Sequence, residues 1–438
     1  MSTLRDRLAD LAEDARPGAP DPDLWGRGRR YARRRRAATV GGVLAVALLA
    51  ALSAAGVAGR PLHPVQPAAP EGRTVLPDRI FTPSPRLPTA DGPTGPLVAV
   101  LPAEHFDWLG HGAPGLVGVS AVDQSYAFLD LPGFLGDAGG QDTTWSLSTD
   151  GRWLSYWYGP TPDEAGTVIA DGIAVLDTST GAVRRHRFET EHGLAPQPVG
   201  WAGDTVYFAQ YDYTELRDDG ASATLVASFA WPAGADAPER VEDPQRLLAS
   251  PSGPAGPDGF VASGAGRSWY AVRQPSDLLR TPLARLRLGQ TQPARVALGP
   301  DGQTLAWVQP DQGGSTGQLT TAPVGDGQPV SPVEAGVGRF PSLVGWLDDD
   351  RVVLETARDG RLVLEAVDVT SGEVEVLSTF DRSYRSGEQL AVGLLDSPVV
   401  DAVPPPQPHD PRLVAAGVGA GVLLLLLLGL VLWRRRAR

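Results

Sequence analysis

The stretch Ser146-Leu-Ser-Thr-Asp150-Gly151-Arg152-Trp153-Leu-Ser-Tyr-Trp-Tyr158 has the pattern of a short strand, a tight turn and a second strand. Its Asp-Gly pair predicts a two-residue hairpin turn, because the central positions of such turns need a positive φ that Gly adopts without penalty. After the turn, Trp153 and Trp157 alternate with Tyr156 and Tyr158. The stretch therefore predicts a β-hairpin with aromatic side chains on both faces.

Landmarks of this unit recur along the chain at multiples of about 48 residues. They are Asp150-Gly151 with Asp301-Gly302 (151 residues apart), Val199-Gly200-Trp201 with Val344-Gly345-Trp346 and Val392-Gly393-Leu394 (145 and 48 apart), and Asp177-Thr-Ser-Thr-Gly181 with Asp368-Val-Thr-Ser-Gly372 (191 apart). A repeat of this length with several short strands is typical of a β-propeller blade.

We therefore expect an all-β fold, a single β-propeller of about six (five to seven) four-stranded blades over residues 97–397. One blade is predicted to have strands near 143–148, 153–158, 172–177 and 183–188. The Val392 landmark lies in an incomplete last unit, so its remaining strands are expected from residues 97–131. Strands from both ends would then close the ring and remove an open sheet edge. A pair of β-sandwiches is the alternative architecture.

Two copies of the unit carry a resemblance to a known family. Ser-Thr-Asp-Gly-Arg-Trp-Leu-Ser-Tyr at 148–156 and Gly-Pro-Asp-Gly-Gln-Thr-Leu-Ala-Trp at 299–307 resemble the Ser-Pro-Asp-Gly-Lys-x-Leu-Ala-[Tyr/Phe] pattern of TolB-like, WD-repeat-like propellers. At Gly345-Trp-Leu-Asp-Asp-Asp-Arg351 the turn glycine is missing. The resemblance implies a protein-binding propeller or scaffold and carries no catalytic residue across.

Amino-acid composition and charge indicate the type of genome and restrict the classes of binding partner. The chain has 438 residues, no Cys, and Arg as its only strongly basic residue, which indicates a GC-rich genome of the actinobacterial type. Residues 60–412 hold 24 Arg against 45 acidic residues, so their charge is strongly negative although both ends are basic. Such a segment repels phosphate backbones, and nucleic acid is therefore not an expected partner.

Two uncharged apolar segments, 37–59 and 413–433, are each long enough to cross a bilayer as a helix. The flanking residues expected to anchor them are Arg33, Arg34, Arg35, Arg36, Trp433, Arg434, Arg435 and Arg436. Basic residues favour the cytoplasmic side, so residues 1–36 and 434–438 are predicted inside and the acidic propeller outside. We thus expect a two-pass protein of the plasma membrane, with the lipid bilayer as one partner.

The sequence leaves alternative roles open for the N-terminal segment and for the first apolar segment. Residues 2–15 have the period of a short amphipathic helix, and a regulatory role for it, as in membrane-bound anti-sigma proteins, is one alternative. The segment 37–59 could instead be a cleaved export signal, because Ser53-Ala-Ala55 and Gly56-Val-Ala58 match small-residue cleavage patterns. Residues 60–96 and 398–412 are Pro-rich and predict semi-rigid spacers.

No catalytic, cofactor-binding or metal-binding motif is predicted. Gly313-Gly-Ser-Thr-Gly317 matches the Gly-x-Ser-x-Gly sequence pattern of a nucleophile elbow. An elbow, however, needs a strand before it and a helix after it. His105 and His111 flank Asp107 as a weak pair, and Asp348-Asp-Asp350 lacks the ligand spacing of a calcium loop. These residues are expected in ordinary loops and turns.

Aromatic residues give the candidate binding surface, namely Trp145, Trp153, Trp157, Tyr211 and Tyr213. Core packing between blades is the alternative role for them, since Trp and Tyr form binding surfaces only where they reach the outside. We expect a non-enzymatic module that binds a protein, a peptide or a cell-envelope ligand, and that senses or scaffolds. The alternative is a glycosidase-like envelope hydrolase with carboxylates at the central mouth of the propeller.

Overall fold

The computed structural model describes Gly26 and residues 73–437, with gaps at 108–109, 137–144, 161–167, 218–219, 245, 250–258, 265–267, 280–283, 286–294, 312–315, 326–328, 382–386 and 409. The chain divides into two units, Pro64–Pro408 and the combination of Met1–His63 with His409–Arg438. The helices predicted at 2–15 and 37–59 lie outside the described residues, as does the linker up to residue 72.

The described strands of the larger unit form six sheets of three to five strands and one separate two-stranded pair. The first sheet is β25 (Gln389–Leu390), β3 (Leu97–Phe106), β4 (Gly112–Ser120) and β5 (Tyr126–Phe128). The second is β6 (Trp145–Leu147), β7 (Trp153–Tyr158), β8 (Gly172–Asp177) and β9 (Ala182–Arg187). The third is β10 (Gly200–Ala202), β11 (Thr205–Arg217), β12 (Gly220–Pro232) and β13 (Glu239–Val241).

The remaining strands complete the ring. The fourth sheet is β14 (Phe260–Gly264), β15 (Ser268–Val272) and β16 (Ala284–Arg285). The fifth is β17 (Val296–Leu298), β18 (Thr304–Pro310), β19 (Gly317–Pro323) and β20 (Ser331–Pro332). The sixth is β21 (Arg339–Trp346), β22 (Arg351–Arg358), β23 (Arg361–Asp368), β24 (Val374–Phe380) and β2 (Arg79–Ile80). Short 3-10 turns are η1 (Leu247–Ala249), η2 (Pro275–Leu279) and η3 (Val392–Leu394).

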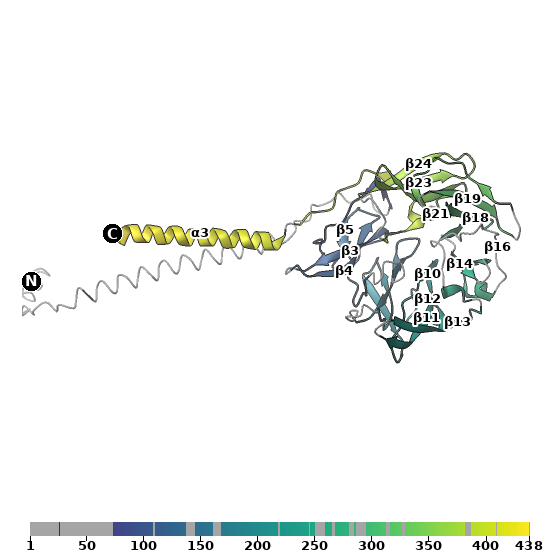
Figure 1. Ribbon diagram of the computed structural model, residues 1–438, viewed down its shortest axis with the longest axis horizontal. Helices are drawn as coiled ribbons and strands as arrows, with labels where there is room; N and C mark the ends of the chain where they lie inside the picture. Colours follow the sequence, from purple (N-terminus) through teal and green to yellow (C-terminus); the bar gives the residue numbers. More distant parts are fainter. Residues whose placement is uncertain are drawn as a thin grey trace, which may run out of the picture. The chain divides into compact units, whose positions relative to one another are not determined.

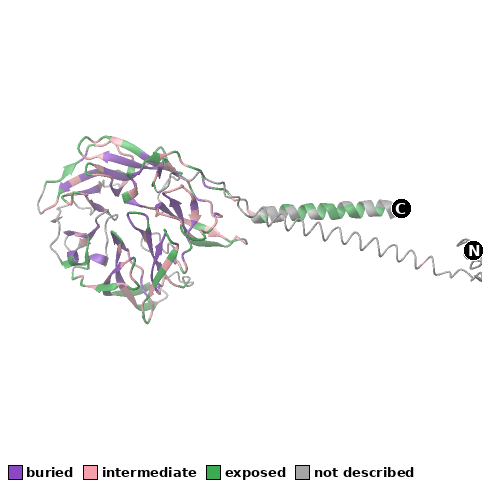
Figure 2. Ribbon diagram, turned by 180° about the vertical axis from the view of Figure 1, so that it is seen from behind, coloured by how far each residue is buried: buried purple, intermediate pink, exposed green. Residues whose placement is uncertain are grey.

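The sheets are arranged around a centre, with β10, β14 and β21 nearer to it and β13, β16 and β24 at the rim (Figure 1). Six apolar clusters each join two successive sheets, and the last of them joins the sixth sheet back to the first. Buried residues are accordingly concentrated in the strands (Figure 2). The predicted β-propeller is confirmed, its sheet number lies within the expected five to seven, and sheets of three and five strands occur beside those of four.

Both ends of the propeller take part in closing the ring. β25, from the C-terminal part, pairs antiparallel with β3, with Leu390 opposite Ala99. β2, from the N-terminal part, adds a parallel strand to β24 at the outer edge of the sixth sheet. β1 (Leu76–Pro77) and β26 (Val399–Val400) then pair with each other in parallel. The expectation that residues 97–131 complete the last unit is confirmed.

The predicted spacers are shorter than the Pro-rich composition suggested. Leu76, Ile80 and Leu87 are buried in the core cluster between the first and sixth sheets, so residues 73–96 belong to the propeller. The C-terminal segment likewise forms β26 before it leaves the fold. The apolar residues interspersed among these prolines explain the difference, because burying them stabilises the pairing by about 1.5 to 3 kcal/mol each.

The second sheet follows the hairpin prediction closely. Its strands at 145–147, 153–158, 172–177 and 182–187 match the expected ranges within two residues wherever they are described. Trp153 and Trp157 pack toward the third sheet, whereas Leu154 and Tyr156 pack toward the first. The turn itself is longer than the predicted two residues, because Gly151 N–H donates to Ser148 O at 3.0 Å and Ser148 N–H to Trp153 O at 2.8 Å.

The repeat landmarks occupy equivalent places in their sheets. Both Asp-Gly pairs lie between the first and second strands of a sheet, and the Asp177 and Asp368 loops both join the third strand to the fourth. Each Gly-Trp indole bonds back to the preceding sheet, Trp201 Nε1 to Ser146 O at 3.0 Å and Trp346 Nε1 to Ala297 O at 3.4 Å. The third Gly landmark differs, since Val392–Leu394 forms η3 just after β25 rather than a strand.

The smaller unit is described through one long helix. Helix α3 spans Pro411–Ala437, which includes the whole apolar segment predicted at 413–433. Among the described residues, no helix combines the length and the hydropathy needed to span a membrane.

Candidate functional site

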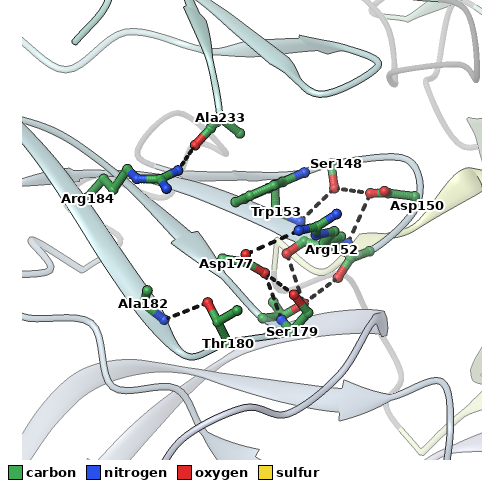
Figure 3. Close-up of polar contacts among 12 residues, drawn as sticks. Ser148, Asp150, Arg152, Trp153, Asp177, Ser179, Thr180, Ala182, Arg184 and Ala233 are labelled. Carbon is green, nitrogen blue, oxygen red and sulfur yellow. Dashed lines mark hydrogen bonds and ion pairs between the residues drawn. The ribbon is translucent and has the colours of Figure 1, made fainter. Parts of the chain in front are cut away.

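The Asp150-Gly151 turn is held by a polar network that ties two loops of the second sheet together (Figure 3). Ser148 Oγ donates to Asp150 Oδ1 at 2.6 Å and accepts from Trp153 N–H at 2.9 Å. Arg152 reaches across to Asp177 at 3.4 Å, and Asp177 also accepts from the N–H and hydroxyl of Ser179. Burial alone would raise the pKa of Asp177, but these hydrogen bonds hold it below its usual value.

This turn lies against both closing ends of the ring. Leu97 N–H, at the start of β3, donates to Gly151 O at 2.9 Å. Gly393 N–H, in η3, donates to Thr149 O at 2.8 Å. The Gln389 side chain spans the same seam, donating to Trp145 O at 2.9 Å and accepting from Leu147 N–H at 2.8 Å. The seam between the first and second sheets is thus fixed by backbone and side-chain bonds.

The three tryptophans of the predicted binding surface lie inside the fold. Trp145 is 3% exposed, Trp153 is 7% exposed and Trp157 is fully buried. Trp157 Nε1 is satisfied by Gln197 O at 2.8 Å, and the Arg152 guanidinium covers the Trp153 ring at 4.6 Å. Their large rings fill the space between neighbouring sheets. This is the core-packing role that was the alternative to a binding surface. The structure therefore does not support an exposed surface made of these indoles.

Tyr211 and Tyr213 lie half-buried on β11 of the third sheet, whereas the three tryptophans belong to strands of the second sheet. The Tyr213 hydroxyl donates to Val168 O at 3.0 Å, and burial raises the pKa of Tyr213. Tyr211 O accepts from Ala195 N–H at 2.9 Å. These contacts tie the long β11–β12 hairpin to two loops, one before β8 and one before β10.

A pocket of about 300 Å³ opens beside Trp145, between the first and second sheets. It is lined by Pro102, Ala103 and Glu104 of β3, Gly112, Pro114, Gly115 and Leu116 of β4, Phe134, and Trp145 of β6. Its volume is at the small end of ligand pockets, and its walls combine apolar and aromatic groups with one carboxylate. We take this pocket, called the seam pocket below, as the candidate site.

Sequence reasoning found one residue of the seam pocket, Trp145, and missed the others. The ladder between β25 and β3 stops at Val100, which leaves the inner edge of β3 beyond it without a β25 partner. Pro102 comes two residues later, and proline is typical of a strand position whose N–H has no ladder partner. Pro102 and Pro114 within two strands are therefore the signal that could have indicated the end of the β25 pairing and the pocket beside it.

The metal and nucleophile-elbow candidates do not form such sites where they are described. Within the described ranges, no three His, Asp or Glu side chains are close enough to hold a metal ion. The buried Glu365 is paired with Arg358 at 2.6 Å and accepts from Thr356 Oγ1 at 2.9 Å. Gly317 begins strand β19 rather than a helix, which is not the context of a nucleophile elbow, and residues 312–315 lie outside the described part.

The remaining polar candidates have local roles. Asp348 accepts from the N–H of Arg351 at 2.8 Å and pairs with its guanidinium at 2.7 Å, so the Asp348–Asp350 run forms a capped turn. His111 Nδ1 lies 3.0 Å from Asp107 Oδ2 on the surface. His105 instead stacks on Phe128 with ring centroids 4.2 Å apart, and burial lowers the pKa of His105.

Comparison with known proteins finds similar structures but no similar sequence. No protein-family model matches the chain, and no curated protein matches its sequence. TolB from Acinetobacter baumannii is similar at 13% identity and a TM-score of 0.38, over 67% of this chain and 66% of that chain, slightly less than two thirds of its length. The β-propeller domain of the Trilobed protease from Pyrococcus furiosus is similar at 14% identity and a TM-score of 0.37, over 67% of this chain and 85% of that domain. The propeller assignment itself rests on the sheet topology and the six core clusters.

Proposed function

We propose that this chain is a membrane-anchored, extracytoplasmic β-propeller that binds a protein or cell-envelope ligand at the seam pocket and catalyses no reaction. The observation that carries the binding role is the seam pocket, an open, partly aromatic cavity beside a rigid seam of the ring. Sites of this kind are concave, mostly apolar and largely formed before the ligand arrives.

The membrane part of the proposal is supported by the sequence. The segments 37–59 and 413–433 carry no charge and are flanked by arginines on the sides expected to face the cytoplasm. In α3, large apolar side chains are exposed, among them Leu424 at 64% and Leu423 at 61%. A continuous apolar surface of this kind is unfavourable in water and favours a bilayer or protein partner.

Two variants of the full chain test the binding role. Pro114→Arg places a long side chain at the exposed rim of the seam pocket, and Val376→Arg makes the same kind of change on the outer strand β24, where Val376 is 48% exposed. We expect wild type and Val376→Arg to retain a specific protein or polymer from envelope extract, and Pro114→Arg to lose it. Retention of nothing by the wild type, or equal retention by both variants, would contradict the proposal.

The orientation is tested separately on intact cells. Added protease should cut within residues 97–395 and leave the two apolar segments with their arginines protected. Full protection of the propeller until the cells are lysed would place it on the cytoplasmic side.

A further inference from the structure

The described lining of the seam pocket carries a single charged group. Among the described residues that line it, Glu104 is the only ionisable one and none is basic. Glu104 is exposed, and within the described part of the chain its carboxylate makes no ion pair. A carboxylate beside an apolar wall favours a positively charged ligand. The cation would pair with the carboxylate, and no described basic side chain would compete for it.

The backbone positions this carboxylate at the rim. Glu104 lies opposite Pro114 in the β3–β4 ladder, and its side chain folds across Gly112. A Cβ at position 112 would overlap the Glu104 carboxylate, so the glycine makes room for it. The carboxylate therefore lies against the β4 wall of the pocket.

Aromatic groups form another part of the lining. Trp145 is held through its carbonyl by Gln389 at 2.9 Å, and Phe134 packs on Tyr156 with ring centroids 6.1 Å apart. Fixed aromatic rings attract cations through their faces, and a planar guanidinium also stacks on them. The strongly acidic composition of residues 60–412 would concentrate cationic partners near the site.

We propose that the seam pocket binds an arginine side chain of the partner, with its guanidinium paired to Glu104 and its apolar stem against Pro102, Phe134 and Trp145. This rests on the proposed function, since the arginine belongs to the captured partner. A volume of about 300 Å³ is suited to one side chain rather than to a large cofactor.

The test compares two soluble probes on the purified full chain by ligand-observed saturation-transfer NMR. N-acetyl-argininamide carries the charge, and N-acetyl-citrullinamide is its neutral isostere. We expect the arginine probe to bind about fivefold more tightly at low salt, and the preference to shrink as ionic strength rises. Glu104→Gln should reduce this preference to about twofold or less and Glu104→Lys should abolish arginine binding. Asp91→Asn, at an exposed site outside the pocket lining, should change neither.

Equal affinity for the two probes, or an arginine preference that survives both Glu104 variants, would overturn the inference. Such a result combined with normal partner capture by the wild type would leave the binding function standing. Absence of capture combined with a Glu104-dependent arginine preference would instead overturn the proposed function alone.

Discussion

Gly151 has two properties that make it hard to replace. Its φ is +70°, a region that L-residues with a side chain rarely adopt, and a Cβ there would overlap the backbone carbonyl of Leu97. Gly302 has the equivalent turn position and a φ of +68°, but its Cβ would meet only the guanidinium of Arg273, at 2.7 Å. Substitutions at Gly151 and Gly302 therefore allow the cost of backbone strain to be distinguished from the cost of disturbing the contact across the seam.

We expect Gly302→Ala to lower the free energy of unfolding by about 1 kcal/mol through backbone strain alone. Gly151→Ala should lower it by about 3 kcal/mol, because the backbone of Leu97 must move as well. Urea denaturation of both full-chain variants measures the difference. Equal losses would show that the contact between Gly151 and Leu97 contributes nothing.

Asp177 gives a prediction for acid. Its pKa is lowered in the folded state, so its contribution to stability is complete above the ordinary value of 3.8 and is lost as pH falls below it. Asp177→Asn should cost about 1 kcal/mol at pH 7 through weakened hydrogen bonds. The variant should also lose less stability than wild type between about pH 4 and pH 2.

Urea unfolding at a series of pH values, with Asp91→Asn as an exposed control, measures this dependence. If wild type and Asp177→Asn lose the same free energy below pH 4, the network around Asp177 does not stabilise its charged form.

At the scale of elements, Gln389 joins two strands that belong to different sheets. Its amide replaces two ladder bonds between β25 and β6, one to Trp145 O and one from Leu147 N–H. Gln389→Ala leaves both backbone groups without these partners and should lower the free energy of unfolding by about 2 kcal/mol. Gln389→Glu keeps the acceptor for Leu147 N–H but sets a carboxylate oxygen against the Trp145 carbonyl, and should cost at least as much. Thermal unfolding of the two variants checks the order, and a loss under about 0.5 kcal/mol in Gln389→Ala would contradict this role in closure.

The sequence predicts strands well where a turn residue and alternation agree. Asp150-Gly151 and the alternation of Trp153–Tyr158 located β6 and β7, and the Asp177 loop located β8 and β9. Strands were not predicted where short segments that are far apart in the chain pair with each other. β1, β2 and β26 have two residues each, and their neighbours' prolines outweigh any strand pattern, so only the fold reveals that they pair.

For the whole molecule, the repeat spacing was sufficient for the architecture, because propeller blades share one length and their landmarks recur at it. The binding site did not follow from composition. Trp145 was predicted with Trp153 and Trp157 as one surface, but alternation and sheet packing bury all three. Glu104 and Phe134 come together with Trp145 only in the folded chain, where the first and second sheets pack on each other.

The proposed propeller binds its partner at the seam pocket, on the outside of the membrane. Photo-cross-linking in intact cells tests it most directly, with p-benzoylphenylalanine replacing Pro114 at the pocket rim or, as control, Val376 on β24. We expect a discrete adduct from position 114 that is absent from position 376 and is lost when Glu104→Lys is added. No adduct from position 114, or the same adduct from both positions, would contradict it.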